Sequence, residues 1–136
     1  MKKIFLITFL LFYINPLFAE IIKNIRIEGN DRISDETIKV YGDIKINENV
    51  DELKINQIIK NLYSTNFFED IQVSIQNKTL VITLNEYPVI NEIIIVGEKT
   101  TKFQEAIKKN ITSKKNGPFK KSFIAEDEKI IKKLYS

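Results

Sequence analysis

Few side chains in this sequence are suited to chemistry. The chain has no histidine and no cysteine, which removes the usual general base, the commonest metal ligand and the thiol nucleophile. The acidic pair Asp35–Glu36 comes closest to an acid–base couple. It directly follows Ser34, a preferred helix N-cap residue, and acidic side chains are favoured in the first turn of a helix. We interpret the pair as a helix start, so the sequence predicts no enzyme, no catalytic residue, no metal site and no cofactor.

The stretch from residue 99 to residue 121 is rich in lysine. It contains eight lysines against a single acidic residue, Glu105. Such a patch can meet phosphate or anionic lipid. We interpret the patch as part of the enrichment of the whole chain in lysine, isoleucine and asparagine, a bias expected of an AT-rich genome. Because the chain is predicted to be exported, and an exported chain rarely meets nucleic acid, we expect no nucleic-acid partner.

The prediction of export rests on the first nineteen residues. Two lysines are followed by an uncharged apolar run, residues 4–14, then by Asn15-Pro16 and by the small residue Ala19. This order is typical of a secretory signal peptide, and the run is shorter than the roughly 20 residues of a membrane-spanning helix. An uncleaved anchor is the alternative. Without residues 1–19 the chain carries 19 basic and 18 acidic residues, and its apparent basicity largely disappears.

A repeat organises the remainder of the chain. The heptad IIKNLYS at residues 58–64 recurs as IIKKLYS at residues 130–136, with six of its seven residues identical. The triplet Ile93, Ile95 and Gly97 stands 68 positions after an equivalent triplet, Ile25, Ile27 and Gly29. Recurrence of this kind indicates tandem domains. We predict a first domain over residues 20–87 and a second, incomplete domain over residues 88–136.

Within the first domain, hydrophobic periodicity predicts the order strand, helix, helix, strand, strand. Alternation over residues 21–29 indicates a strand that ends at Gly29, and Ser34 begins the first helix. Apolar residues at helical spacing predict the second helix over residues 55–64, with Asn66 as its left-handed cap. Phe67 and Phe68 are predicted to turn back into the core. The fold class is therefore α+β, with two helices covering one face of a three-stranded sheet.

The last two strands of this domain form a predicted hairpin around Asn77-Lys78. Its first strand is short and lacks proline and lysine, which commonly protect exposed sheet edges. Such an edge can accept an extended chain through backbone hydrogen bonds, which are indifferent to the sequence of that chain. The alternative is that a neighbouring unit covers the edge or that it stays empty. The predicted client- or partner-binding residues are Ile71, Gln72, Val73, Ser74, Ile75 and Gln76.

The second domain is expected to repeat this order as far as its second helix. A strand is predicted over residues 93–97, a helix capped by Thr100 or Thr101, and a final helix that Ser122 opens. No hairpin follows, which would leave the apolar faces of the helices exposed. We therefore expect the sequence to be a fragment cut inside its second domain, with further chain in the full-length product.

The segment LYSTNFFEDIQV, residues 62–73, resembles the helix-end-to-strand signature of POTRA domains, the polypeptide-transport-associated modules. The family form is close to LY-x-T-G-x-F-E-D-V, and Asn66 stands where glycine is usual, a change that still permits positive φ. IRIEGNDRIS (residues 25–34) and ITLNEYPVINEI (residues 82–93) resemble the family's opening and its junction between units. The likeness covers residues 21–136. A signal peptide followed by tandem units is similar to the start of outer-membrane β-barrel assembly factors.

That resemblance implies a periplasmic array that leads to a C-terminal barrel in the outer membrane, a barrel that is absent from this sequence. The array would receive unfolded outer-membrane proteins and dock the lipoproteins of an assembly complex. Two other roles keep the same fold. One is that of a related transporter, TamA-like or a two-partner secretion pore, and the other that of an FtsQ-like cell-division protein. The number of units in the full-length product separates these possibilities.

Overall fold

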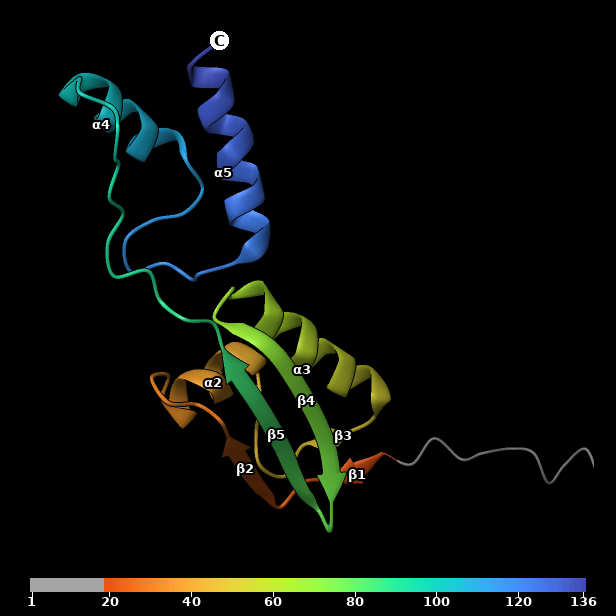
Figure 1. Ribbon diagram of the computed structural model, residues 1–136. Coiled ribbons are helices and arrows are strands. Elements are labelled where there is room, and N and C mark those ends of the chain that lie inside the picture. Colours follow the sequence, from red (N-terminus) through yellow and green to blue (C-terminus); the bar gives the residue numbers. More distant parts are fainter. Residues whose placement is uncertain (1–18) are drawn as a thin grey trace, which may run out of the picture.

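The computed structural model describes residues 19–136 (Figure 1). The predicted signal peptide therefore lies outside the described residues, apart from Ala19. Among the residues that are described, no helix is both long and apolar enough to cross a membrane. We call residues 20–87 the N-terminal lobe and residues 88–136 the C-terminal lobe. The elements are β1 (Glu20–Ile21), β2 (Asn24–Glu28), α2 (Asp35–Gly42), β3 (Asn49–Val50), α3 (Glu52–Ser64), β4 (Phe68–Gln76), β5 (Thr79–Glu86), α4 (Thr101–Asn110) and α5 (Lys121–Leu134).

The N-terminal lobe is built on a three-stranded sheet in the order β2-β5-β4. The central strand β5 runs parallel to β2 and antiparallel to β4. Asn77 and Lys78 join β4 to β5 with φ angles of 50° and 60°, as the favoured two-residue hairpin turn requires. The α+β prediction is confirmed. A second, two-stranded pairing of β1 with β3 escaped prediction because strands of two residues have no detectable periodicity.

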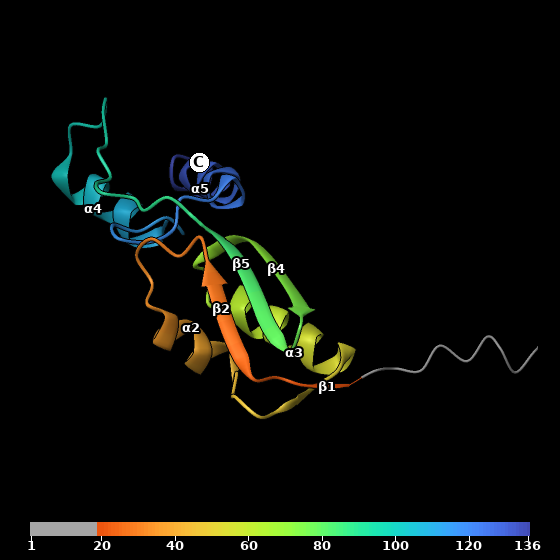
Figure 2. The same ribbon diagram turned by 90° about the horizontal axis from the view of Figure 1, so that it is seen from below.

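Both helices of this lobe lie on the same side of the sheet (Figure 2). Their cap residues follow the expected chemistry: the Ser34 hydroxyl accepts the Thr37 amide at 3.2 Å, and the Asp51 carboxylate accepts the Lys54 amide at 2.8 Å. Apolar residues from helices, strands and loops fill the space between the layers. The buried core consists of Ile22, Ile38, Ile44, Val50, Ile58, Leu62, Phe68, Ile71, Leu80, Ile82 and Leu84.

The two phenylalanines after α3 behave differently from one another. Phe68 is 1 % exposed and belongs to the core, as predicted, whereas Phe67 is 39 % exposed. The prediction for Phe67 was wrong because successive residues entering a strand point to opposite sides. The Phe67 ring instead meets the ring of Tyr41, with 6.1 Å between the centroids. Between helix and strand, Asn66 takes the predicted left-handed conformation with φ of 61°.

The C-terminal lobe contains two helices and no strand among its described residues. The segment 93–97 was predicted to be a strand, but it has no partner, and only an isolated bridge joins Val89 to Pro118. A strand exists only where a neighbour supplies the other half of its hydrogen-bond ladder. The start of the last helix also differs from prediction. The cap of α5 is Lys120 and not Ser122, while Thr100 caps α4 as expected, although its side chain makes no capping bond.

Gly29 and Gly97 occupy equivalent positions in the repeat and should respond differently to alanine. Both have positive φ, 84° and 92°, but a Cβ on Gly29 would lie 2.0 Å from the Leu84 carbonyl oxygen, whereas Gly97 has open space around it. We expect Gly29→Ala to lower the free energy of unfolding by about 3 kcal/mol or more, and Gly97→Ala by about 1 kcal/mol, because only the first adds a clash to the backbone strain. Urea unfolding of both variants, followed by circular dichroism, checks this. Equal losses would contradict it.

Glu86 ties the end of β5 to the loop before α2. Its Oε1 accepts the amides of Arg32 and Ile33 at 3.1 and 3.0 Å, and its Oε2 lies 2.8 Å from Arg32 Nε, with the Glu86 side chain only 6 % exposed. We expect Glu86→Gln to lower the free energy of unfolding by roughly 1–3 kcal/mol, because it removes the charge from a buried acceptor of several hydrogen bonds. The matched control is Glu28→Gln, which breaks an exposed pair with Arg26 and should cost less than about 0.5 kcal/mol. Urea denaturation midpoints measure both, and a silent Glu86→Gln would refute the role.

Candidate functional site

The six residues predicted to bind a client or partner all lie on β4, at the border of the sheet (Figure 1). One side of this strand pairs with β5, with Ile71 opposite Leu84 and Val73 opposite Ile82. No strand pairs with its other side among residues 19–136. Its outward-pointing amides and carbonyls are therefore free to pair with an incoming extended chain.

Side chains along β4 alternate between the two faces of the sheet. Ile71 is buried and Val73 and Ile75 are half-buried against the helices, while Gln72, Ser74 and Gln76 are exposed on the opposite face. The strand is nine residues long, from Phe68 to Gln76, so the prediction of a short strand was wrong. It is irregular only between Phe68 and Asp70. An added strand would continue the sheet with the same alternation. The structure thus places the predicted residues together on one accessible edge, and binding to that edge stays a prediction.

The free edge of β4 is suited to binding an extended chain. The described residues contain no cluster of three or more acidic, histidine or cysteine side chains that could hold a metal ion. What the β4 edge presents is a row of backbone donors and acceptors. Backbone hydrogen bonds recognise an extended conformation and not a particular sequence.

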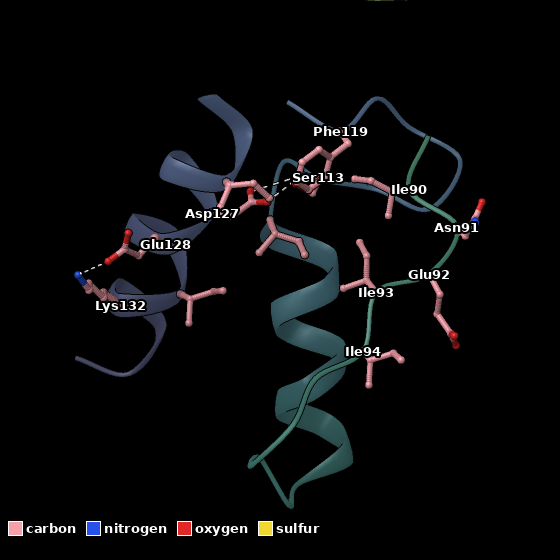
Figure 3. A pocket seen from close by; sticks show the side chains of 13 residues that line it. Ile90, Asn91, Glu92, Ile93, Ile94, Ser113, Phe119, Asp127, Glu128 and Lys132 are labelled. Atoms are coloured by element: carbon pink, nitrogen blue, oxygen red, sulfur yellow. Dashed lines mark hydrogen bonds and ion pairs between the residues drawn. The ribbon is translucent and has the colours of Figure 1, made fainter. Parts of the chain in front are cut away.

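A second candidate lies in the C-terminal lobe, where a groove of about 880 Å³ separates residues 90–94 from α5 (Figure 3). Its walls are apolar, and its lining includes Ile90, Ile93, Ile94, Ile111, Phe119, Ile124 and Ile131. The hydroxyl of Ser113 is buried at this groove and has no hydrogen-bond partner among the described residues. In the N-terminal lobe, the corresponding space between the first strand and the second helix holds β5 and β4.

Asp127 is the one carboxylate buried at this groove, with 6 % of the residue exposed. Its carboxylate accepts the backbone amides of Thr112 and Ser113, the latter at 3.1 Å, and so fastens the loop after α4 to α5 (Figure 3). Burial raises the pKa of Asp127, but the hydrogen bonds from Ser113 and Thr112 outweigh burial and leave the pKa below its ordinary value.

Sequence reasoning missed Asp127, although a signal was present. It occupies the apolar stripe of the last helix, four residues after Phe123 and four before Ile131. A carboxylate at a buried position of an amphipathic helix needs hydrogen-bond donors in the folded protein. The position of Asp127 in the apolar stripe therefore predicts that hydrogen-bond donors lie near its carboxylate. Which donors these are depends on the path of the loop after α4 in the folded chain.

Asp127 makes the C-terminal lobe sensitive to acid. Because its pKa in the folded chain is lowered from 3.8, its contribution to stability is complete above about pH 4 and disappears as the pH falls through the folded value. We expect hydrogen-exchange protection of the Thr112 and Ser113 amides to fall in that acidic window. Asp127→Asn should reduce this protection at neutral pH and flatten its pH dependence, whereas Glu126→Gln, an exposed change one residue away, should leave it unaltered. Protection that persists in Asp127→Asn would contradict this assignment.

Comparison with known protein families and sequences identifies relatives of this chain. The POTRA family model, described as "Surface antigen variable number repeat", matches residues 20–87. The chain is 36 % identical over 92 residues to the "Outer membrane protein assembly factor BamA" of Neisseria meningitidis, and 33 % identical over 98 residues to the protein of the same name from Buchnera aphidicola. These matches cover 68 % and 70 % of this chain but only 11 % and 16 % of the relatives, so the chain spans a small part of their length.

Solved structures show the same fold at low sequence identity. The N-terminal domain of Omp85 from Thermosynechococcus elongatus matches 85 % of this chain and 50 % of that chain, with a TM-score of 0.58 and 14 % identity. The first three POTRA domains of Omp85 from Anabaena match 87 % of this chain and 51 % of that chain, with a TM-score of 0.52 and 12 % identity. The family match to the N-terminal lobe, its strand–helix–helix–hairpin order and these likenesses agree: the chain belongs to the POTRA family.

Proposed function

We propose that this chain is the periplasmic, N-terminal part of an outer-membrane protein assembly factor, and that its β4 edge receives extended segments of unfolded client proteins. The observation that carries the proposal is the open edge of β4, regular over most of its nine residues and unguarded by proline or lysine. The relatives named as assembly factors support the wider role. Export directed by the signal peptide would deliver the chain to the periplasm.

The physical properties of the edge fit a transient receiver. Each hydrogen bond between the backbones of β4 and a client contributes about 0.5–1.5 kcal/mol net. A short added strand must also be ordered on binding, which offsets much of this gain. The balance gives weak, reversible binding that does not depend on client sequence. A factor that hands many different chains onward requires both properties.

The remaining elements of the proposal concern the full-length protein. Further chain would supply additional units and a barrel in the outer membrane, and the array would dock the lipoproteins of an assembly complex. The work would be done by binding alone, without a catalytic step or a cofactor. A TamA-like transporter, a secretion pore or an FtsQ-like division protein would use the same fold. The similarity to two proteins named as assembly factors favours the first role.

Hydrogen exchange tests the proposal at the level of single amides. An extended peptide of about ten residues with alternating apolar and polar side chains, the pattern of a transmembrane β-strand, serves as the probe. We expect its addition to protect alternate amides of β4, because only every second amide of an edge strand points outward. The amides of β2 (residues 24–28) should not change. Protection on β2 alone, or on neither strand, would refute the β4 edge as the receiver.

A pair of substitutions provides the matched control. Ser74 on β4 and Thr83 on the central strand β5 are both exposed on the helix-free face of the sheet. Ser74→Lys places a guarding charge on the edge strand and should weaken peptide binding by about fivefold or more. Thr83→Lys adds the same charge one strand inward and should change binding by less than about twofold. Titration of peptide fluorescence anisotropy measures both, and equal effects would show that charge, and not the edge, controls binding.

A further inference from the structure

Backbone hydrogen bonds within the C-terminal lobe tie its first residues to the loop before α5. The chain leaving β5 is bound by the loop before α5: the Ile90 amide donates to the Gly117 carbonyl at 2.9 Å, and the Phe119 amide donates to the Pro88 carbonyl at 2.7 Å. The Asn116 amide in turn donates to the Ile90 carbonyl at 2.7 Å. The connection is therefore a paired stretch of backbone and not a free linker.

Lys120 extends from this stretch to the N-terminal lobe. Its ammonium group donates to the side-chain oxygen of Asn66, lies 4.9 Å from the centre of the Tyr87 ring, and lies 5.1 Å from the centre of the Phe123 ring. Asn66 and Tyr87 belong to the N-terminal lobe, and Phe123 belongs to α5. One cation is thus held by a hydrogen bond and by two aromatic rings, which attract it through their negative faces.

The partners of Lys120 in the N-terminal lobe are themselves fixed. The Tyr87 amide donates to the Phe67 carbonyl at 2.9 Å, and the Tyr87 carbonyl accepts a hydrogen bond from Arg32 Nη2 at 2.7 Å. Asn66 is held in the left-handed conformation at the end of α3. Lys120 therefore contacts groups whose own backbone is held by hydrogen bonds or by a defined helix end.

The position of Lys120 is unfavourable for its own helix. It is the N-cap of α5, makes no side-chain capping bond there, and no acidic residue follows in the first turn. A helix N-terminus carries partial positive charge and prefers a serine, threonine or acidic cap. Such a local mismatch is expected where a residue serves a tertiary role.

The same charge is favourable for the other helix. The last turn of α3 contains no basic residue, and the C-terminal end of a helix attracts cations. Lys120, bonded to Asn66 just beyond that end, supplies the missing cation from the other lobe. The side-chain oxygen of Asn66 accepts this bond, whereas a glycine could adopt the same left-handed backbone but could not accept the bond.

From these contacts we propose that Lys120 and Asn66 form an inter-lobe clamp that fixes the angle between the two lobes. The clamp has a direct consequence for β4, which begins two residues after Asn66. It holds the start of this edge strand at a set position relative to the C-terminal groove. Lys120 is a positioning residue in this scheme and contacts no client.

The angle between the lobes can be measured by electron spin resonance. The chain has no cysteine, so Asn56→Cys on α3 and Glu126→Cys on α5, both exposed positions, give two unique sites for spin labels. We expect one narrow distance distribution in the parent chain. Lys120→Met, which keeps the side-chain length without the charge, and Asn66→Gly, which keeps the left-handed backbone without the oxygen, should each broaden it about twofold or more.

Two further variants separate the clamp from general charge effects. Lys120→Arg retains a cation able to donate to Asn66 and to stack on Tyr87, and should largely preserve the narrow distribution. Lys129→Met removes an exposed lysine of α5 and should leave it unchanged. Parent-like distributions in both Lys120→Met and Asn66→Gly would overturn the proposal, as would equal broadening in Lys129→Met. Far-UV circular dichroism establishes that each variant is folded, and the peptide-binding test at β4 is independent of either result.

Discussion

The backbone pairing of the central strand β5 is the constraint on which the N-terminal lobe depends. β5 satisfies hydrogen bonds on both of its sides, with β2 running parallel and β4 antiparallel. It also buries Leu80, Ile82 and Leu84 against the helices. Two parallel strands must be joined by a long crossover connection. The segment between β2 and β5 is this crossover, and it contains both helices and the first hairpin strand. The close approach of Gly29 to the Leu84 carbonyl and the buried carboxylate of Glu86 then fasten the start of that crossover to the strand.

The C-terminal lobe has no strand equivalent to β5 among its described residues, and its organisation changes accordingly. The segment 93–97 repeats the pattern of β2 yet forms no ladder, and Ile94 and Val96 are 72 % and 89 % exposed. In this lobe, side-chain contacts hold the helices and loops together, whereas in the N-terminal lobe strand pairing does part of this. Asp127 secures the loop after α4 to α5 through backbone amides. At the other end of the lobe, the Tyr135 ring packs on Phe103 and the Tyr135 hydroxyl donates to Glu98.

The β4 edge and the proposed clamp are close in the sequence, because Asn66 lies two residues before the start of β4. The orientation of the β4 edge relative to the C-terminal lobe sets the direction in which a bound client strand would extend beyond the sheet. The chain between α3 and β4 contains the Lys120 acceptor Asn66 and leads directly into the edge. In the proposed clamp, Lys120 and Asn66 couple the orientation of the edge to the orientation of the C-terminal lobe.

The sequence by itself determined the features that depend on short-range physics. The N-cap Ser34, the left-handed Asn66, the Asn77-Lys78 turn, the two helical stripes and the alternation of β4 all arise within a few residues of chain, and together they were sufficient to predict the α+β order and the six edge residues. Tertiary structure decided the rest. The unpaired state of residues 93–97, the buried Asp127 and the N-cap Lys120 depend on groups distant in the sequence. Local propensity determines which conformation a short segment prefers. A strand pairing, a buried carboxylate or a bound cation also needs a second group, and folding alone brings that group close.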